Sequence, residues 1–263
     1  MNDQVKSVKS AERVLDLLEL LSLRGEAMRL NDIAQTLGYP KSSTHALLGT
    51  LVSRGYVERD GAERYRLAEE IREGFNWVGG YEAILRRHAL PIMEAARART
   101  GETVFLSVRG ENHDARQVAK LVSHQHIRYD SPGTVRVPAY ASVMGRVLLA
   151  HAPPEEVDAY LAATELKPFT DKTVTTEAGI RAILADIRAR GYGTIVEEFV
   201  IGGCGVCAPV RDRSGKVVAV LNIATVTQRY ELQKDEMRDC VLASAAELSA
   251  RLGHAGAPPT GET

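Results

Sequence analysis

Apolar residues recur with helical spacing in three stretches near the start of the chain, over residues 10–23, 30–37 and 41–53. In the second stretch they fall at positions i, i+3, i+4 and i+7, which form one face of a helix: Leu30, Ile33, Ala34 and Leu37. Gly38 then stands where a left-handed residue commonly ends a helix, and a serine after Lys41 is available to cap the next one. Two helices joined by a tight glycine-containing turn are the helix-turn-helix arrangement, although the pattern also suits two helices of any small α domain.

The outward positions of the third stretch carry mostly small and polar side chains: Ser42, Ser43, His45, Ala46, Gly49, Thr50 and Ser53. Such a face lets a helix approach a surface like the DNA major groove closely. Two strand-like runs, 56–59 and 64–67, then flank an Asp60-Gly61 turn, which is a strong indication of a β-hairpin. A hairpin directly after the second helix is the wing of a winged helix, and its arginines suit contacts with phosphates.

These features together resemble the winged-helix domain of the IclR family of bacterial transcriptional regulators. The resemblance spans residues 8–67 and rests on the segments SAERVLDLL (10–18), LNDIA (30–34), KSSTH (41–45) and LLGTL (47–51). It implies contact with double-stranded operator DNA. The candidate DNA-binding residues are Lys41, Ser42, Ser43, His45, Ala46, Gly49, Thr50, Arg54, Arg59, Arg64 and Arg66. The family usually carries an arginine where this chain has Ala46, so one expected charged contact is missing.

Bulk charge adds nothing to the DNA-binding interpretation. The 263 residues carry a net charge of −1, and residues 1–67 hold ten Lys and Arg against nine Asp and Glu. DNA binding must therefore come from the local placement of cations. A hydrophobic content of 44% and a charged content of 25% are typical of a globular protein.

The apolar runs, the N-terminal segment and the cysteine count predict the cellular compartment and whether the chain contacts a membrane. No apolar run reaches the ~18 residues that suggest a spanning helix. The N-terminal segment lacks the apolar core of a secretory signal, and three cysteines do not make a disulfide framework. We therefore expect a cytoplasmic protein with no membrane contact.

Beyond the wing the spacing of apolar positions changes. Residues 68–100 are expected to form linker helices, with Pro91 kinking the longer helix or marking its start. From Glu102 a period of two predicts strands at 103–110, 116–123, 126–131, 134–140, 192–200, 205–212 and 216–226. Helices are expected at 142–151, 153–164, 176–191 and 232–252, followed by a disordered tail over 253–263.

The expected fold class is α+β, with three parts before the tail. Residues 1–67 form the winged helix-turn-helix domain, 68–100 the linker, and 101–252 a C-terminal α/β domain. The interleaving of strands and helices predicts a mostly antiparallel sheet with helices on both faces.

A second resemblance to the IclR family lies in this C-terminal part. Residues 138–142 (PAYAS) followed by Gly145 resemble the family segment LPLHATASG, and three further segments also fit: IRARGY (187–192), Glu197-Glu198 and APV (208–210). The resemblance then covers about residues 8–252 and implies a GAF-like domain that binds a small-molecule effector. Two departures are Tyr140 in place of the usual histidine and Cys207 in place of the usual alanine.

The stretch from Tyr140 to Gly145 is the best candidate for ligand binding. It runs from an expected strand into a helix N-terminus, where unpaired N–H groups favour anions, although an ordinary strand-to-helix turn is the alternative. Arg128, on the preceding expected strand, would suit a carboxylate. The candidate effector-binding residues are His126, Arg128, Tyr140, Ser142, Val143, Met144, Glu197, Cys207, Asn222 and Ala224. We expect a small carboxylate effector, with aromatic acids and related amides as the leading types.

Other chemistry-bearing residues favour neither a metal site nor an enzyme. Cys204 and Cys207 have the spacing of half a zinc site, but residues three apart on a strand face opposite sides and no second pair exists. His124 and His126 would share a strand face without a third ligand. No nucleophile elbow or dinucleotide fingerprint is present. We therefore expect no catalytic residue, no metal and no cofactor.

The combined interpretation is a DNA-binding transcriptional regulator whose operator binding responds to a small organic effector. An enzyme built on the C-terminal domain and a sensor that acts on a protein partner are the alternatives, and both repression and activation suit the sequence. One helix-turn-helix reads few base pairs, so we expect a homodimer, which the family resemblance extends to a tetramer through residues 102–252. The candidate dimer contacts are the apolar face of residues 10–23 and a helix around 69–78 with Phe75 and Trp77.

Overall fold

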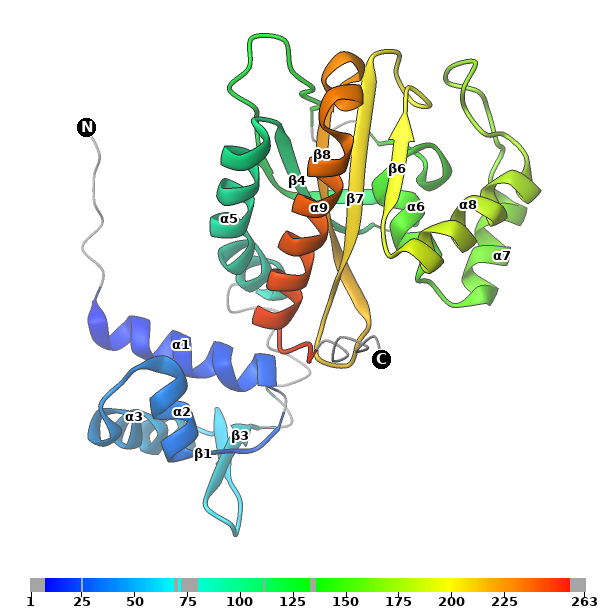
Figure 1. Ribbon diagram of the computed structural model, residues 1–263. Coiled ribbons are helices and arrows are strands. Elements are labelled where there is room, and N and C mark those ends of the chain that lie inside the picture. The colour runs from blue at the N-terminus through cyan, green and yellow to red at the C-terminus, as the bar shows by residue number, and fades with distance from the viewer. Residues whose placement is uncertain are drawn as a thin grey trace, which may run out of the picture. The chain divides into compact units, whose positions relative to one another are not determined.

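The computed structural model describes residues 8–24, 26–68, 71, 80–110, 112–132 and 136–255. The chain divides into two compact units, Met1–Ile84 and Leu85–Thr263, whose elements are labelled in Figure 1. The expected helix with Phe75 and Trp77 lies outside the described residues, as do most of the expected N-terminal and C-terminal tails. Among the helices of the described residues, none is long and apolar enough to cross a bilayer.

The N-terminal unit is a winged helix. Its elements are α1 (Lys9–Arg24), β1 (Met28–Arg29), α2 (Leu30–Leu37), α3 (Lys41–Ser53), β2 (Val57–Arg59) and β3 (Arg64–Leu67). The three strands form an antiparallel sheet in the order β1-β3-β2. The core between helices and sheet is apolar and contains Leu17, Leu21, Ile33, Leu48 and Tyr65. The predicted helix-turn-helix and hairpin are thus confirmed.

The turn between α2 and α3 follows from two residues. Gly38 has φ of 67°, the left-handed conformation that glycine adopts without strain, and it ends α2. Pro40 occupies the N-cap position of α3, and its carbonyl accepts the first helical hydrogen bond from the N–H of Thr44 at 3.0 Å. The expectation of a serine cap was wrong, because no side chain caps this helix.

The C-terminal unit is built on a five-stranded sheet in the order β5-β4-β8-β7-β6, with every neighbouring pair antiparallel. The strands are β4 (Thr103–Arg109), β5 (Ala115–Leu121), β6 (Gly193–Val196), β7 (Gly203–Arg211) and β8 (Val217–Val226). The helices are α5 (Gly80–Thr100), α6 (Val143–Ala150), α7 (Pro154–Ala163), α8 (Glu177–Arg190) and α9 (Thr227–Arg251), with a 3₁₀ turn at Ala139–Ala141. This arrangement confirms the expected α+β fold class with an antiparallel sheet.

Helices cover both faces of this sheet. A Cβ atom added at Gly205 of β7 would lie 3.4 Å from Val143 of α6, whereas the sulfur of the adjacent Cys204 is 3.5 Å from the hydroxyl of Thr227 in α9. Adjacent residues of a strand point to opposite faces, so α6 and α9 pack on opposite sides. Figure 1 shows α9 in front of β7 and β8.

Several expected strands and boundaries differ from the structure. Residues 122–132 and 136–138 form no strand, and β6 ends at Val196 instead of continuing to residue 200. Helix α9 begins at Thr227, five residues before the expected start. Pro91 lies inside α5, which is one of its two expected placements.

The segment after β5 avoids strand pairing for a physical reason. Thr103 donates its hydroxyl to the carbonyl of Tyr129 at 2.7 Å and accepts the N–H of Ser123 at 3.0 Å, while Ser123 donates to the carbonyl of Gly101. Such side-chain bonds satisfy backbone groups that a ladder would otherwise use. Proline at 132 and 138 removes two further N–H donors.

Candidate nucleic-acid interface and ligand cavity

Helix α3 presents a continuous exposed face that no other described element covers. The side chains of Lys41, Ser42, His45, Ala46, Gly49, Thr50 and Arg54 are exposed, whereas Thr44, Leu48 and Leu51 face the core. Thr50 turns its hydroxyl back to the carbonyl of Ala46 at 3.0 Å. The exposed face therefore carries mostly small side chains, with a cation at each end, Lys41 and Arg54.

Ser43 differs from the other predicted contact residues. It is half-buried, and its hydroxyl accepts a hydrogen bond of 3.1 Å from the guanidinium of Arg13 in α1. That guanidinium lies 5.0 Å from the centre of the Tyr39 ring, and the Tyr39 hydroxyl donates to Asp16. The hydrogen bond to Asp16, with burial second, raises the pKa of Tyr39 to about 12. Ser43 thus takes part in fixing α3 against α1.

The wing carries the three arginines predicted to contact phosphates, and each is engaged by a carboxylate of the same hairpin. Arg64 pairs with Asp60 at 2.8 Å, Arg66 with Glu58 at 2.8 Å, and Arg59 with Glu63 at 2.5 Å. Lys41 and Arg54, in contrast, have no ion-pair partner among the described residues.

The C-terminal unit contains a cavity of about 810 Å³, including space open to solvent, between the sheet and the N-terminus of α6. Five of the predicted effector-binding residues line it: Ser142, Val143, Met144, Asn222 and Ala224. Apolar and aromatic side chains form most of the wall, among them Phe105, Tyr129, Ile195 and Phe199. Such a cavity, mostly apolar with few polar groups, is typical of small-molecule sites.

The polar groups of the cavity are neutral. None of the described lining residues is charged, and the polar side chains are Ser107, Gln117, Tyr129, Ser131, Ser142 and Asn222, with Cys204 beside them. Asn222 is 4% exposed, and its Oδ1 has no hydrogen-bond partner among the described residues. A buried, unpartnered polar atom is rare and calls for an explanation.

Gly205 makes room for the Asn222 amide. A Cβ atom at this position would come within 2.9 Å of Asn222 Oδ1, closer than real Cβ contacts allow. The glycine therefore lets the amide lie across β7, on the cavity face.

The N-terminus of α6 offers fewer donors than expected. Ser142 is its N-cap, and the hydroxyl accepts the N–H of Gly145 at 3.0 Å. The N–H groups of Val143 and Met144 are in the first turn, where a helix supplies no internal acceptor. A ligand would find these two N–H groups and the Ser142 hydroxyl proton, but not the N–H of Gly145.

The other predicted effector-binding residues do not line the cavity. His126 and Arg128 are exposed in the irregular segment after β5, and Arg128 donates to the carbonyl of Gln125, so the strand expected over 126–131 was wrong. Cys207 is fully buried in the core against α6, and burial raises the pKa of its thiol well above the usual value.

Tyr140 and Glu197 have structural partners instead. The Tyr140 hydroxyl bonds to the backbone N–H and carbonyl of Lys167 at 2.8 Å each. Glu197 accepts from Lys172, Thr227 and the N–H of Gly202, and these bonds, Lys172 first, lower the pKa of Glu197 to about 2.

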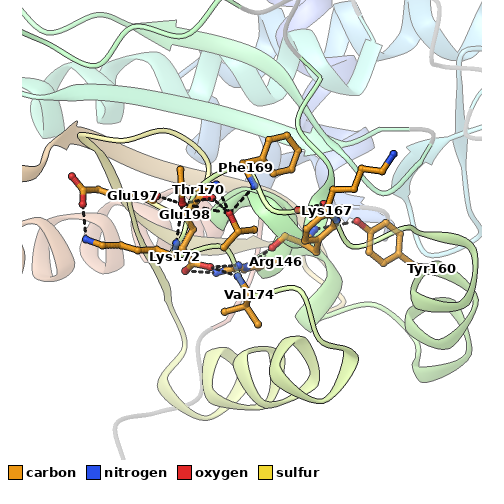
Figure 2. Close-up of polar contacts among 11 residues, drawn as sticks. Arg146, Tyr160, Lys167, Phe169, Thr170, Lys172, Val174, Glu197 and Glu198 are labelled. Carbon is orange, nitrogen blue, oxygen red and sulfur yellow. Dashed lines mark hydrogen bonds and ion pairs between the residues drawn. The ribbon is translucent and has the colours of Figure 1, made fainter.

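A buried ion pair supports one wall of the cavity. Arg146 of α6 donates from its two terminal guanidinium nitrogens to the two carboxylate oxygens of Glu198, at 2.8 and 2.5 Å. Figure 2 shows this pair. Arg146 is 1% exposed and also donates to the carbonyl of Tyr140 at 2.6 Å. Glu198 directly precedes Phe199, which lines the cavity and packs on Phe169 with ring centres 5.0 Å apart.

Several lining residues were missed from the sequence, although one pattern contained them. Phe105 and Ser107 share a face of β4 by alternation, and Phe105 pairs directly with Asn222 of β8. The alternation was visible in the sequence, but the pairing of β4 with β8 was not.

A winged helix joined to an antiparallel α/β domain with a ligand-sized cavity defines a class, the ligand-responsive DNA-binding regulators. Residues 82–250 match the family model described as bacterial transcriptional regulator IclR C-terminal, and residues 10–61 match the IclR helix-turn-helix domain. The chain belongs to the IclR family of transcriptional regulators.

Relatives and solved structures agree with this assignment. The glycerol operon regulatory protein of Streptomyces coelicolor is 32% identical over 259 residues, which cover 93% of this chain and 98% of the relative. The HTH-type transcriptional regulator BhcR of Paracoccus denitrificans is 32% identical over 251 residues, covering 92% and 86% of the two chains. These named relatives are regulators, so the alternative of an enzyme is set aside.

Two solved structures extend the comparison to the fold. The Thermotoga maritima IclR structure has a TM-score of 0.61 at 27% identity, covering 94% of this chain and 99% of that chain. An IclR homolog from Microbacterium hydrocarbonoxydans, complexed with 4-hydroxybenzoate, has a TM-score of 0.60 at 26% identity, covering 92% and 98%.

Proposed function

We propose that the operator binding of this regulator is modulated by a small organic molecule held in the cavity of the C-terminal unit. The observation that carries the proposal is the unpartnered Oδ1 of Asn222, which is buried and lines the cavity. Leaving such an atom unsatisfied costs roughly 1–3 kcal/mol, which a bound ligand with a hydrogen-bond donor would offset.

The chemistry of the cavity favours an effector with a polar end, an apolar or aromatic body and a hydrogen-bond donor for Oδ1 of Asn222. A carboxylate or amide end would meet the N–H groups of Val143 and Met144 and the hydroxyl of Ser142. The body would lie against Met144, Phe105 and Phe199, and Ala224 leaves room for it on the sheet. The 4-hydroxybenzoate complex of a structural relative is compatible with this class of ligand.

A mobility-shift assay tests the proposed function. We expect the full chain to shift DNA taken from beside its own gene, and a ligand that fits the cavity to change that shift. The probes are 4-hydroxybenzoate and 4-hydroxybenzamide, which separate an anionic from a neutral polar end. If the chain shifts no duplex from its own locus, the proposal that it binds operator DNA is refuted.

Asn222→Leu should weaken ligand binding and leave ligand-free DNA binding close to wild type. The leucine fills a similar volume but cannot bond to the ligand, and the loss of about 1–3 kcal/mol corresponds to roughly 5- to 150-fold weaker binding. Isothermal titration with whichever probe binds the wild type measures ligand affinity. A DNA-release assay measures DNA binding with and without that probe.

A matched control lies one residue further along the same strand. Ile223→Leu changes a buried side chain on the opposite face of β8, away from the lining residues, and should leave the ligand response intact. If Asn222→Leu responds like the wild type and the control, the effector binds elsewhere.

Assembly is a separate expectation. We infer that the chain binds DNA as a two-fold dimer on paired half-sites, with association into a tetramer as the extension of that arrangement. Leu15 of α1 is exposed beside the buried Leu17 and Leu18, which leaves an apolar side chain for a partner helix. Light scattering at micromolar concentration should give at least twice the chain mass of 28.7 kDa, and a mass equal to one chain would contradict the inference.

A further inference from the structure

The wing is charged but has no net charge. Its hairpin holds three cations, Arg59, Arg64 and Arg66, and three anions, Glu58, Asp60 and Glu63. All six are paired within the hairpin, and the Glu58–Arg66 pair joins directly opposed residues of β2 and β3. The hairpin therefore adds nothing to the net charge of residues 1–67.

The hairpin holds one of these carboxylates in place through its backbone. Asp60 accepts the N–H groups of Ala62 and Arg64 at 2.9 Å each, in addition to the side chain of Arg64. These bonds, the backbone N–H of Arg64 first, lower the pKa of Asp60 below its usual value and so favour the ionised carboxylate. Asp60 therefore both shapes the turn and keeps a negative charge at the tip of the wing.

We propose that the wing is electrostatically self-neutralised, so that Glu58, Asp60 and Glu63 prevent its arginines from adding to the binding of DNA phosphates. A phosphate can displace an exposed carboxylate, because such ion pairs are worth only about 0–1 kcal/mol. The displaced carboxylate, however, remains beside the polyanion, and like charges in an interface are unfavourable. The wing therefore brings no net charge to the DNA and releases no counterions.

The charge that binds DNA must then come from other residues. Lys41 and Arg54 stand at the two ends of α3, both exposed and with no carboxylate partner among the described residues. They flank the face of α3 that approaches the groove, so their contacts with phosphates would fix the helix without help from the wing. The wing then contacts DNA through its shape and adds no net charge to the interface.

Salt dependence of binding tests this inference, with a labelled duplex of random sequence as the probe. The slope of log K against log salt reports about 0.9 for each phosphate neutralised. Glu58→Gln/Glu63→Gln releases Arg66 and Arg59 and should steepen the slope by about 1.8. Each released arginine should therefore increase the loss of affinity between about 50 and about 200 mM salt by about 3.5-fold. Removing both members of the two pairs together, in Glu58→Gln/Arg59→Gln/Glu63→Gln/Arg66→Gln, keeps the net charge of the wing and should leave the slope nearly unchanged, within about 0.5.

A control outside the wing separates local pairing from net charge. Glu247→Gln frees Arg251 from an exposed i,i+4 pair in α9, and we expect no change of slope. The inference is overturned if the charge-neutral fourfold variant flattens the slope by about 1.8, or if the glutamate variant behaves like the wild type. The inference rests on DNA binding by the winged helix: a wild type that binds no duplex at low salt would refute that function, whereas normal binding with the wrong slopes would refute only the self-neutralised wing.

Discussion

Gly49→Glu is expected to abolish operator binding while leaving the fold intact. Gly49 lies on the exposed face of α3, and a Cβ atom there meets nothing within 4 Å. A glutamate would place a carboxylate between the helix and the phosphates, where like charges cost several kcal/mol. At 1.4 kcal/mol for each factor of ten, we expect affinity to fall by at least about 100-fold in a mobility-shift assay.

The matched control is Gly49→Gln, which has nearly the same shape without the charge. Both substitutions replace a helical glycine and should stabilise α3 by up to about 1 kcal/mol, so misfolding would not explain a loss of binding. Position 49 is a sharper test than Ser43, where a glutamate would sit beside Arg13 and pair with it. If Gly49→Glu binds the operator like Gly49→Gln, α3 is not the helix that enters the groove.

The winged helix was predictable because its signals are local. Gly38 and Pro40 determine the backbone within a few residues, and the apolar spacing of 30–37 needs no partner to be recognised. The Asp60-Gly61 pair marks the hairpin, although Glu63 and not Gly61 takes the left-handed conformation there, with φ of 59°. The exposed face of α3 follows from the same periodicity. Periodicity could not predict the role of Ser43, because its hydrogen bond to Arg13 joins residues 30 apart in the sequence.

The cavity was predictable only in part, because it depends on strand pairing. Asn222 and Ala224 lie on one face of β8, as the period of two in 216–226 predicts, and the sequence marks Ser142 to Met144 as a helix N-terminus. Their neighbours on the sheet come from β4, which pairs with β8, and from β5, which pairs with β4, in registers that no local pattern specifies. The position of Arg128 was wrong for the opposite reason: its segment alternates like a strand, but side-chain hydrogen bonds hold it in an irregular conformation.

The pairing of charges was also hidden from the sequence. Counting residues predicts a nearly neutral DNA-binding domain, and the sequence alone leaves the wing arginines available for phosphates. The structure places a carboxylate beside each of them, through i,i+4 contacts at the turn and a cross-strand pair. Net charge alone therefore does not say which cations are available to bind DNA.

Arg146→Met is expected to destabilise the C-terminal unit more than any surface substitution. The side chain of Arg146 is 1% exposed and gives all its described hydrogen bonds to Glu198 and the carbonyl of Tyr140. Methionine leaves the Glu198 carboxylate, 15% exposed, without its cation. Breaking such a pair costs about 3 kcal/mol, which should lower Tm by about 6–12 °C in thermal unfolding followed by circular dichroism.

The double variant Arg146→Met/Glu198→Leu identifies the cause of that loss. Replacing both members of a buried ion pair by apolar residues is often neutral, because neither charge is then left in the interior. We therefore expect the double variant to recover most of the lost Tm. It should bind ligand less well than the wild type all the same, since the ion pair no longer fixes the segment that carries Phe199 into the cavity wall. A double variant as unstable as Arg146→Met would show that the lost bond to the Tyr140 carbonyl, and not the unpaired charge of Glu198, is responsible.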